Sequence, residues 1–212
     1  KTIAAGTINF ALRRSQNIFE QNLSITKNLR HEMNQHKSKV YWFTGISGSG
    51  KSTIANLLEK KLYDKGIRTY ILDGDNIRTG LNRNLGFTDA DRKENIRRIA
   101  EVAKLFANAG IVTIASFITP KKELRTLARE VIREPDFREV FVTCSFETCE
   151  QRDVKGLYAK VKSGDIKNFT GKDSSFEPPE KSSPADLELN TDEKSEHICL
   201  EELYNFAKNV LK

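Results

Sequence analysis

The stretch from Gly45 to Ser52 matches the pattern Gly-x-x-x-x-Gly-Lys-Ser/Thr, which is typical of loops that bind nucleotide phosphates. In such a loop, backbone N–H groups and the dipole of the following helix favour an anion. We expect Lys51 to reach the β- and γ-phosphates of a nucleotide triphosphate and the Ser52 hydroxyl to ligate Mg²⁺. The predicted nucleotide-binding residues of this phosphate-binding loop (P-loop) are Gly45, Ile46, Ser47, Gly48, Ser49, Gly50, Lys51, Ser52 and the adjoining Thr53.

A second group of chemically capable residues is Asp73-Gly-Asp75, which follows the apolar run 69–72. In many enzymes with a P-loop, the acid that organises Mg²⁺ ends the third strand, but the predicted third strand, 111–117, contains no acid. We therefore expect this pair to bind the metal and to accept the proton of the acceptor. Asp73 is expected to lie near Mg²⁺ and to bind it partly through water, and it is our preferred catalytic base. Lys51, Asp73 and Asp75 are the predicted catalytic residues, although the aspartates also suit a turn.

Alternating strand and helix patterns must position these groups. Strands are predicted at 40–44, 69–72, 111–117 and 139–144, with a weaker one at 187–190, and helices at 52–65, 91–109, 121–132, 146–152 and 196–211. This alternation predicts an α/β, three-layer fold of the P-loop NTPase type, with a central parallel sheet flanked by helices. Ligands bind at the carboxyl ends of the strands in such folds.

Residues 153–184 break the alternation with glycines, prolines and many charges, so this segment is either disordered or a lid that excludes water from the transfer. Arg152, at its start, is expected to meet the ATP phosphates. The predicted division is an N-terminal extension or fusion junction, 1–36, with a short polar helix within 24–36, and a P-loop domain, 37–212.

The composition limits the partners. The net charge of +6 suits anionic ligands, but basic residues are interleaved with 29 acidic ones, which argues against nucleic acid. No apolar run of membrane length occurs, so we expect no membrane partner. The three cysteines lack C-x-x-C spacing; we expect near-core thiols and a cytoplasmic setting. His31 and His36 are expected to face solvent.

Several longer motifs resemble those of adenylyl-sulfate kinases (APS kinases). They are 73–87, 91–106, Phe-Ile-Thr-Pro at 117–120, Lys-Gly-Leu-Tyr at 155–158, and 166–171, within a likeness that runs from about Val40 to the C-terminus. The resemblance implies transfer of the ATP γ-phosphoryl group to the 3′-hydroxyl of adenosine 5′-phosphosulfate (APS), giving 3′-phosphoadenylyl sulfate (PAPS) and ADP. It also implies a homodimer.

The family's APS-contacting positions correspond here to Asp75, Asn76, Ile77, Arg78, Phe87, Arg92, Asn95, Ile118, Thr119, Lys155, Asn168 and Phe169. Arg78 and Arg92 suit phosphate and sulfate oxygens, or alternatively form surface ion pairs. Phe87 and Phe169 suit stacking on adenine. Phe87 alone would by default be a core aromatic, whereas burial of Phe169 without ligand is not expected in so polar a segment.

Two positions depart from the family pattern: Thr119 stands where some members have a serine associated with a phosphoserine intermediate, and Lys172 departs with little expected effect. We expect direct in-line transfer, with Thr119 as a substrate contact, since positioning and charge stabilisation supply most of the catalysis. Residues 5–14 resemble the junction of enzymes that fuse a sulfate adenylyltransferase large subunit to an APS kinase. Residue 1 is lysine, which suggests part of a longer chain.

Two alternatives stay open at this stage. A catalytically silent nucleotide-binding module would not release ADP with APS as acceptor, and the intact Lys51, Ser52, Asp73 and Asp75 speak against it. Another small phosphotransferase, such as a sugar-acid kinase, would not need the set Arg78, Phe87, Arg92 and Asn95.

Overall fold

The computed structural model of the chain describes residues 19, 21–165, 169–172 and 174–211. In this part of the chain, parallel strands form a five-stranded sheet in the order β2-β3-β1-β4-β5. The strands are β1 (Val40–Thr44), β2 (Thr69–Asp73), β3 (Val112–Ser116), β4 (Phe137–Thr143) and β5 (Leu187–Asn190). The helices are α1 (Lys27–Asn34), α2 (Lys51–Tyr63), α3 (Gly74–Thr79), α4 (Asp89–Asn108), α5 (Lys122–Ile132), α6 (Phe146–Arg152), α7 (Leu157–Lys162) and α8 (Glu196–Leu211).

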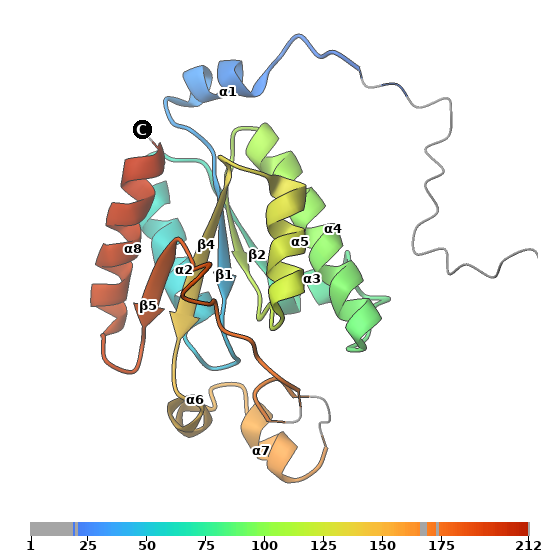
Figure 1. Cartoon of the computed structure of the whole chain (residues 1–212). Helices are drawn as coiled ribbons and strands as arrows, with labels where there is room; N and C mark the ends of the chain where they lie inside the picture. Colours follow the sequence, from blue (N-terminus) through green and yellow to red (C-terminus); the bar gives the residue numbers. More distant parts are fainter. Residues whose placement is uncertain (1–18, 20, 166–168, 173, 212) are drawn as a thin grey trace, which may run out of the picture.

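The sheet is the middle of three layers, with α2 and α8 on one face and α4 and α5 on the other (Figure 1). Side chains of β1 alternate between the two faces: Tyr41 and Phe43 join the core under α2 and α8, and Val40 and Trp42 join the core under α4 and α5. All four are fully buried. Burial on both faces explains why β1 is continuously apolar rather than alternating. The predicted three-layer α/β fold is confirmed.

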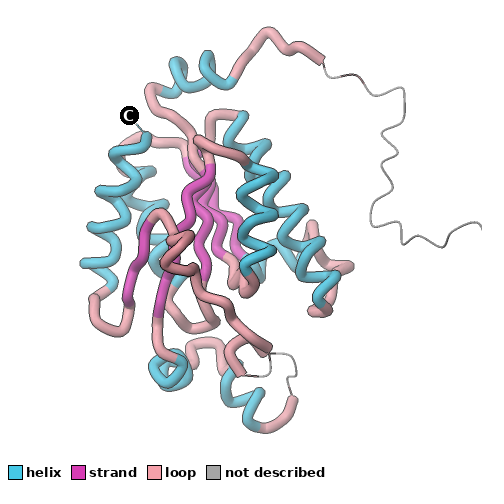
Figure 2. The backbone as a smooth tube through the Cα atoms, viewed as in Figure 1, coloured by secondary structure: helices cyan, strands magenta, loops and turns pink. Residues whose placement is uncertain are grey.

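The carboxyl ends of the strands meet at one end of the sheet, where the connecting loops, α6 and α7 gather (Figure 2). In the register of the sheet, Ser116 of β3 pairs with Asp73 of β2 on one side and with Phe43 of β1 on the other. The last residues of β2 and β3 therefore lie beside the loop that leaves β1. This arrangement brings the two predicted motifs to the same edge.

Two short helices were not predicted. The turn expected at 73–76 is instead the start of α3, because the Asp73 side chain accepts a hydrogen bond from the backbone N–H of Asp75 and caps the helix. The described part of the segment 153–184 contains α7 and isolated bridges.

Among the minor expectations, Cys149 and Cys199 are buried and Cys144 is half-buried, as predicted. The expectation that His36 faces solvent is wrong: it is 8% exposed, and its Nε2 accepts a hydrogen bond from the Arg68 backbone. The half-buried His31 likewise accepts from the Ser38 N–H. The proposed junction at 5–14 and Asn168 lie outside the described residues. Within the described ranges, none of the helices combines the length and the apolar character needed to cross a membrane.

Candidate active site

The P-loop connects β1 to α2 and is shaped by glycine. Gly45 has a φ of +147°, and a Cβ placed there would lie 2.4 Å from the carbonyl oxygen of Val142 in the neighbouring strand. No other residue fits this close approach. Gly50, with a φ of +88°, then leads into the N-terminus of α2, so backbone N–H groups and the positive end of the helix dipole converge on the loop. The loop can hold phosphates in this geometry.

Lys51 is folded into the P-loop. Its Nζ donates hydrogen bonds to the carbonyl of Ile46 at 2.6 Å and to Ser49 Oγ at 3.4 Å, and the residue is 8% exposed. Burial lowers the pKa of Lys51 to about 8, although Cys149 and the aspartates partly counteract the shift. The ammonium group therefore lies in the cradle but is bonded to the loop itself.

Asp73 lies next to the P-loop, as the sequence predicted. Its Oδ2 accepts a hydrogen bond from Ser52 Oγ at 2.9 Å, and its Oδ1 accepts from the Asp75 N–H at 3.0 Å. Ser116 Oγ is 3.4 Å from Ser52 Oγ. A hydroxyl and a carboxylate oxygen side by side are hard oxygen donors that suit Mg²⁺, which keeps several waters when bound to proteins. In the described ranges, clusters of three or more His, Cys, Asp or Glu side chains suited to a metal are absent, so phosphates and water would complete such a site.

Helix α3, helix α4 and the loop between them form a wall that carries Arg78 and Phe87. The Arg78 guanidinium lies 4.4 Å from the centre of the Phe87 ring and donates to the carbonyls of Leu85 and Gly86 at 3.1 Å. Phe87 is 62% exposed, so the default expectation of a core aromatic is wrong. Arg92 donates from Nε to the Phe87 carbonyl at 3.1 Å, which fixes the loop that presents the ring.

The segment that follows α6 makes two polar contacts with α3 and α4. Lys155 donates to Asp75 Oδ2 at 2.5 Å, and Arg92 donates to Thr170 Oγ1 at 3.1 Å. These two contacts join residues far apart in the sequence across the same space. They place Lys155 and Phe169, the neighbour of Thr170, beside the wall of Arg78 and Phe87.

The expectation that Phe169 stays exposed without ligand is wrong, since it is 8% exposed. Its ring packs edge-on against Tyr158, with centroids 4.9 Å apart, and Tyr158 packs in turn against Phe146 at 5.3 Å. Tyr158 belongs to the motif at 155–158, but the sequence predicts no role for its side chain. Its hydroxyl donates to the carbonyl of Ser47 in the P-loop at 2.7 Å. These aromatic residues, with Cys149 and Val161, form a third core of their own.

Two predicted contacts point inward. Thr119 is 1% exposed, and its Oγ1 accepts a hydrogen bond from Trp42 Nε1 at 3.0 Å. Asn95 is 6% exposed, and its Oδ1 accepts from Asn82 Nδ2 at 2.9 Å. Each of these two side chains is thus buried against a partner, and their contact with the substrate stays a prediction.

The other predicted residues differ in burial and in their contacts. Asn76 is exposed, and Ile77 and Ile118 are half-buried. The Ile118 carbonyl accepts from the Gly45 N–H at 3.3 Å. Arg152 donates to the carbonyl of Thr191 at 2.7 Å and to its Oγ1 at 3.2 Å, and Thr191 Oγ1 donates to the Ser49 carbonyl at 3.1 Å. Arg152 is thus held behind the P-loop through Thr191.

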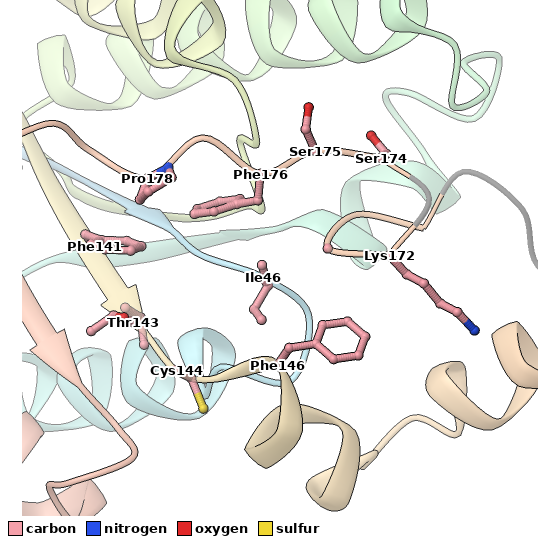
Figure 3. Close-up of a pocket in the computed structure, with 12 residues that line it drawn as sticks. Ile46, Phe141, Thr143, Cys144, Phe146, Lys172, Ser174, Ser175, Phe176 and Pro178 are labelled. Atoms are coloured by element: carbon pink, nitrogen blue, oxygen red, sulfur yellow. The ribbon is translucent and has the colours of Figure 1, made fainter.

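A cavity of about 600 Å³ adjoins the P-loop on the β4 side (Figure 3). Apolar side chains, including Ile46, Phe141, Phe146 and Phe176, line much of it. Of the predicted site residues that the structure describes, only Ile46 is among those that line it. Asp75, Phe87 and Phe169 do not line this cavity.

Comparison with known proteins identifies the family. The family model for adenylylsulphate kinase matches residues 37–190. The adenylyl-sulfate kinase of Staphylococcus carnosus is 50% identical over 196 residues, which cover 92% of this chain and 97% of that protein. The bifunctional enzyme NodQ of Rhizobium sp. (strain N33) is 58% identical over 180 residues, or 85% of this chain, but the chain spans only 28% of NodQ.

A solved structure agrees with these relatives. The Mycobacterium tuberculosis APS kinase CysC in complex with AMPPNP and APS is 46% identical, with a TM-score of 0.77 over 81% of this chain and 98% of that one. The chain belongs to the adenylylsulphate kinase family, and its activity is the phosphorylation of APS to PAPS in sulfate activation.

Proposed function

We propose that this kinase transfers the γ-phosphoryl group directly, in line, from ATP to the 3′-hydroxyl of APS, and that residues 37–212 form the domain that does so. The observation that carries the proposal is the contact of Ser52 Oγ with Asp73 Oδ2. Asp73 contacts Ser52 of the P-loop and caps α3, the helix that carries Arg78. A group in that position serves the donor and the acceptor at once.

On the donor side, the P-loop from Gly45 to Thr53 holds the ATP phosphates, and Lys51 exchanges the Ile46 carbonyl for phosphate oxygens. Ser52 and Asp73 would hold Mg²⁺, which supplies neutralisation of charge on the β- and γ-phosphates. Arg152, fixed by Thr191 behind the loop, contributes positive charge from the other side. All these groups favour the negative charge that is spread over the transferred phosphoryl group.

On the acceptor side, Asp73 takes the proton of the attacking 3′-hydroxyl, and Asp75 orients the substrate. Arg78, Arg92 and Lys155 pair with the phosphate and sulfate oxygens of APS. Phe87 and Phe169 stack on the adenine. The remaining contacts are Asn76, Ile77, Ile118 and Asn168, with Asn95 and Thr119 supporting the site from within.

Burial of the Thr119 hydroxyl supports transfer without a covalent intermediate. The group is 1% exposed, and its oxygen already accepts the Trp42 N–H. A phosphothreonine there would need the loop to open before each turnover. If single-turnover experiments trapped a phosphothreonine that passes its phosphoryl group to APS, direct transfer would be overturned.

We further propose that 153–184 acts as a lid and 1–36 as an extension or fusion junction. The polar contacts of Lys155 and Arg92 across the site support the lid. Relatives of the NodQ type support a link to a sulfate adenylyltransferase. A homodimer and a cytoplasmic setting complete the proposal.

An acceptor screen with MgATP tests the function. We expect ADP release with APS and none above background with AMP or gluconate, and Lys51→Ala should abolish the APS reaction while leaving the far-ultraviolet circular dichroism unchanged. Equal turnover with AMP would refute the assigned acceptor, and near-normal turnover of Lys51→Ala would refute the role of that lysine.

A further inference from the structure

We propose that Tyr158 is a positioning residue that couples the ATP half of the site to the APS half. The inference rests on the proposed function, since it takes the P-loop to bind ATP and Phe169 to face APS. Tyr158 lies on α7, in the segment after α6, and touches both halves through different parts of one side chain. Its hydroxyl contacts the P-loop, and its ring contacts Phe169.

On the ATP side, the hydroxyl fixes one peptide of the P-loop. It donates to the Ser47 carbonyl at 2.7 Å, and the residue is 3% exposed. Burial raises the pKa of Tyr158, so the hydroxyl keeps its proton and remains a donor. In a trans peptide the carbonyl and the following N–H point in opposite directions. Holding the Ser47 carbonyl toward Tyr158 therefore directs the Gly48 N–H away from Tyr158.

Gly48 makes this constraint useful. Its φ of +79° is one that glycine adopts freely, so the adjoining peptide can rotate unless something holds it. A Cβ at Gly48 would lie in tight contact, 3.1 Å from the Cys149 carbonyl of α6, and a residue with a side chain would be strained at this φ, so a stiffer residue is disfavoured there. The Tyr158 hydroxyl provides the constraint that the sequence of the loop cannot provide.

On the APS side, the Tyr158 ring supports Phe169. The two rings meet edge to face, with an interplanar angle of 76° and centroids 4.9 Å apart. Thr170, the next residue, accepts the hydrogen bond from Arg92 at 3.1 Å. Movement of Tyr158 would therefore displace Phe169 and the partner of Arg92 together. Ordering one half of the site then favours order in the other.

Such coupling must be reciprocal: if a bound ATP analogue tightens APS by some factor, APS tightens the analogue by the same factor. Tyr158→Phe removes only the hydroxyl and keeps the ring against Phe169 and Phe146. Loss of one buried hydrogen bond should reduce the coupling factor about 2- to 10-fold. The affinity for APS alone should stay within about twofold, because the ring remains.

Tyr41→Phe is the matched control. Tyr41 is fully buried, and its hydroxyl donates to the Ala207 carbonyl at 3.3 Å, in the core under α2 and α8. Isothermal titration calorimetry measures the affinity of a non-hydrolysable ATP analogue and of APS, each alone and in the presence of the other. The ratio of the two affinities of each ligand gives the coupling factor, once from the analogue and once from APS. We expect it to fall in both directions in Tyr158→Phe and to be unchanged in Tyr41→Phe.

Three results would overturn the coupling role: a coupling factor in Tyr158→Phe within about 1.5-fold of the wild type, an equal loss in Tyr41→Phe, or failure of Tyr158→Phe to fold where Tyr41→Phe folds. The last result would make the hydroxyl a requirement for folding. Failure of the proposed function would look different, because the wild-type enzyme itself would then not phosphorylate APS.

Discussion

Replacing Asp73 by asparagine separates the proposed catalytic role of this residue from its structural one. The carboxylate accepts two hydrogen bonds in the structure. Oδ1 caps α3 by accepting from the Asp75 N–H at 3.0 Å, and Oδ2 accepts from Ser52 Oγ at 2.9 Å. Asparagine is as good an N-cap as aspartate, because its side-chain oxygen accepts the same hydrogen bond. The substitution therefore removes the charge and the basicity but keeps the cap.

The two effects have different magnitudes. Loss of a general base costs about 10² to 10⁴ in rate, so kcat of Asp73→Asn should fall by at least about 100-fold. The free energy of unfolding should change by less than about 0.5 kcal/mol, because the cap persists. Asp73→Ala should lose the same activity and also about 1 kcal/mol of stability, which corresponds to a fall in Tm of about 2 to 4 °C for a domain of this size.

The assay is steady-state ADP release with APS varied at saturating MgATP, together with thermal unfolding of the wild type and both variants. The expected result is a large loss in kcat with a KM for APS within about threefold of the wild type. A kcat of Asp73→Asn within tenfold of the wild type would refute the assignment of Asp73 as base. A rise in KM alone would make it a binding residue, and Asp75 would become the candidate base.

Three further outcomes are expected. Because burial lowers the pKa of Lys51 to about 8, the ammonium is charged below that pH and loses its proton above it. Affinity for an ATP analogue, measured by calorimetry between about pH 7.5 and 9.5, should thus fall with rising pH toward tenfold per unit, and an increase would contradict the role of Lys51. Phe87→Ala should weaken APS binding by about 1–3 kcal/mol without changing stability or ATP affinity, since the ring is 62% exposed; unchanged APS affinity would remove Phe87 from the site. Arg125→Leu should cost about 3 kcal/mol in urea unfolding, because it leaves the buried Glu139 without the guanidinium that lies 3.1 Å away, and the double variant Arg125→Leu/Glu139→Leu should recover much of that loss.

Most of the fold was predictable because its signals are local. The five residues of β1 are all buried, and the first four form an apolar run before a glycine-rich loop. The start of α4 was placed two residues late, since Thr88 accepts the Asp91 N–H and caps the helix ahead of the apolar pattern. Helices α3 and α7, at six residues each, are too short to show a helical period. The residue type of Asp73 indicates a turn, and only the structure shows that its side chain caps α3.

The missed features of the site depend on contacts between distant segments. Tyr158 and Ser47 are 111 positions apart, and Trp42 and Thr119 are 77 apart. From residue type alone, no function was predicted for Tyr158, and Phe169 was predicted to be exposed. Neither pattern nor composition shows which aromatic ring packs on which. Thr119 was predicted to contact the substrate because it carries a hydroxyl group, whereas its burial follows from the position of Trp42.

The strand order explains why the carboxylate beside Ser52 comes from β2. Strand β3 lies between β1 and β2, and it ends in Ser116, a small residue that is 4% exposed and whose hydroxyl lies 3.4 Å from Ser52 Oγ. An acid at Ser116 would fill the space next to Ser52. With serine there, Asp73 reaches Ser52 from one strand further out, about 5 Å toward α3. The carboxylate is thereby moved away from the centre of the phosphate cradle and toward Arg78 and Phe87. We expect this displacement to suit a base that must reach the acceptor hydroxyl next to the phosphate cradle, which an acid at the end of β3 would be less well placed to do.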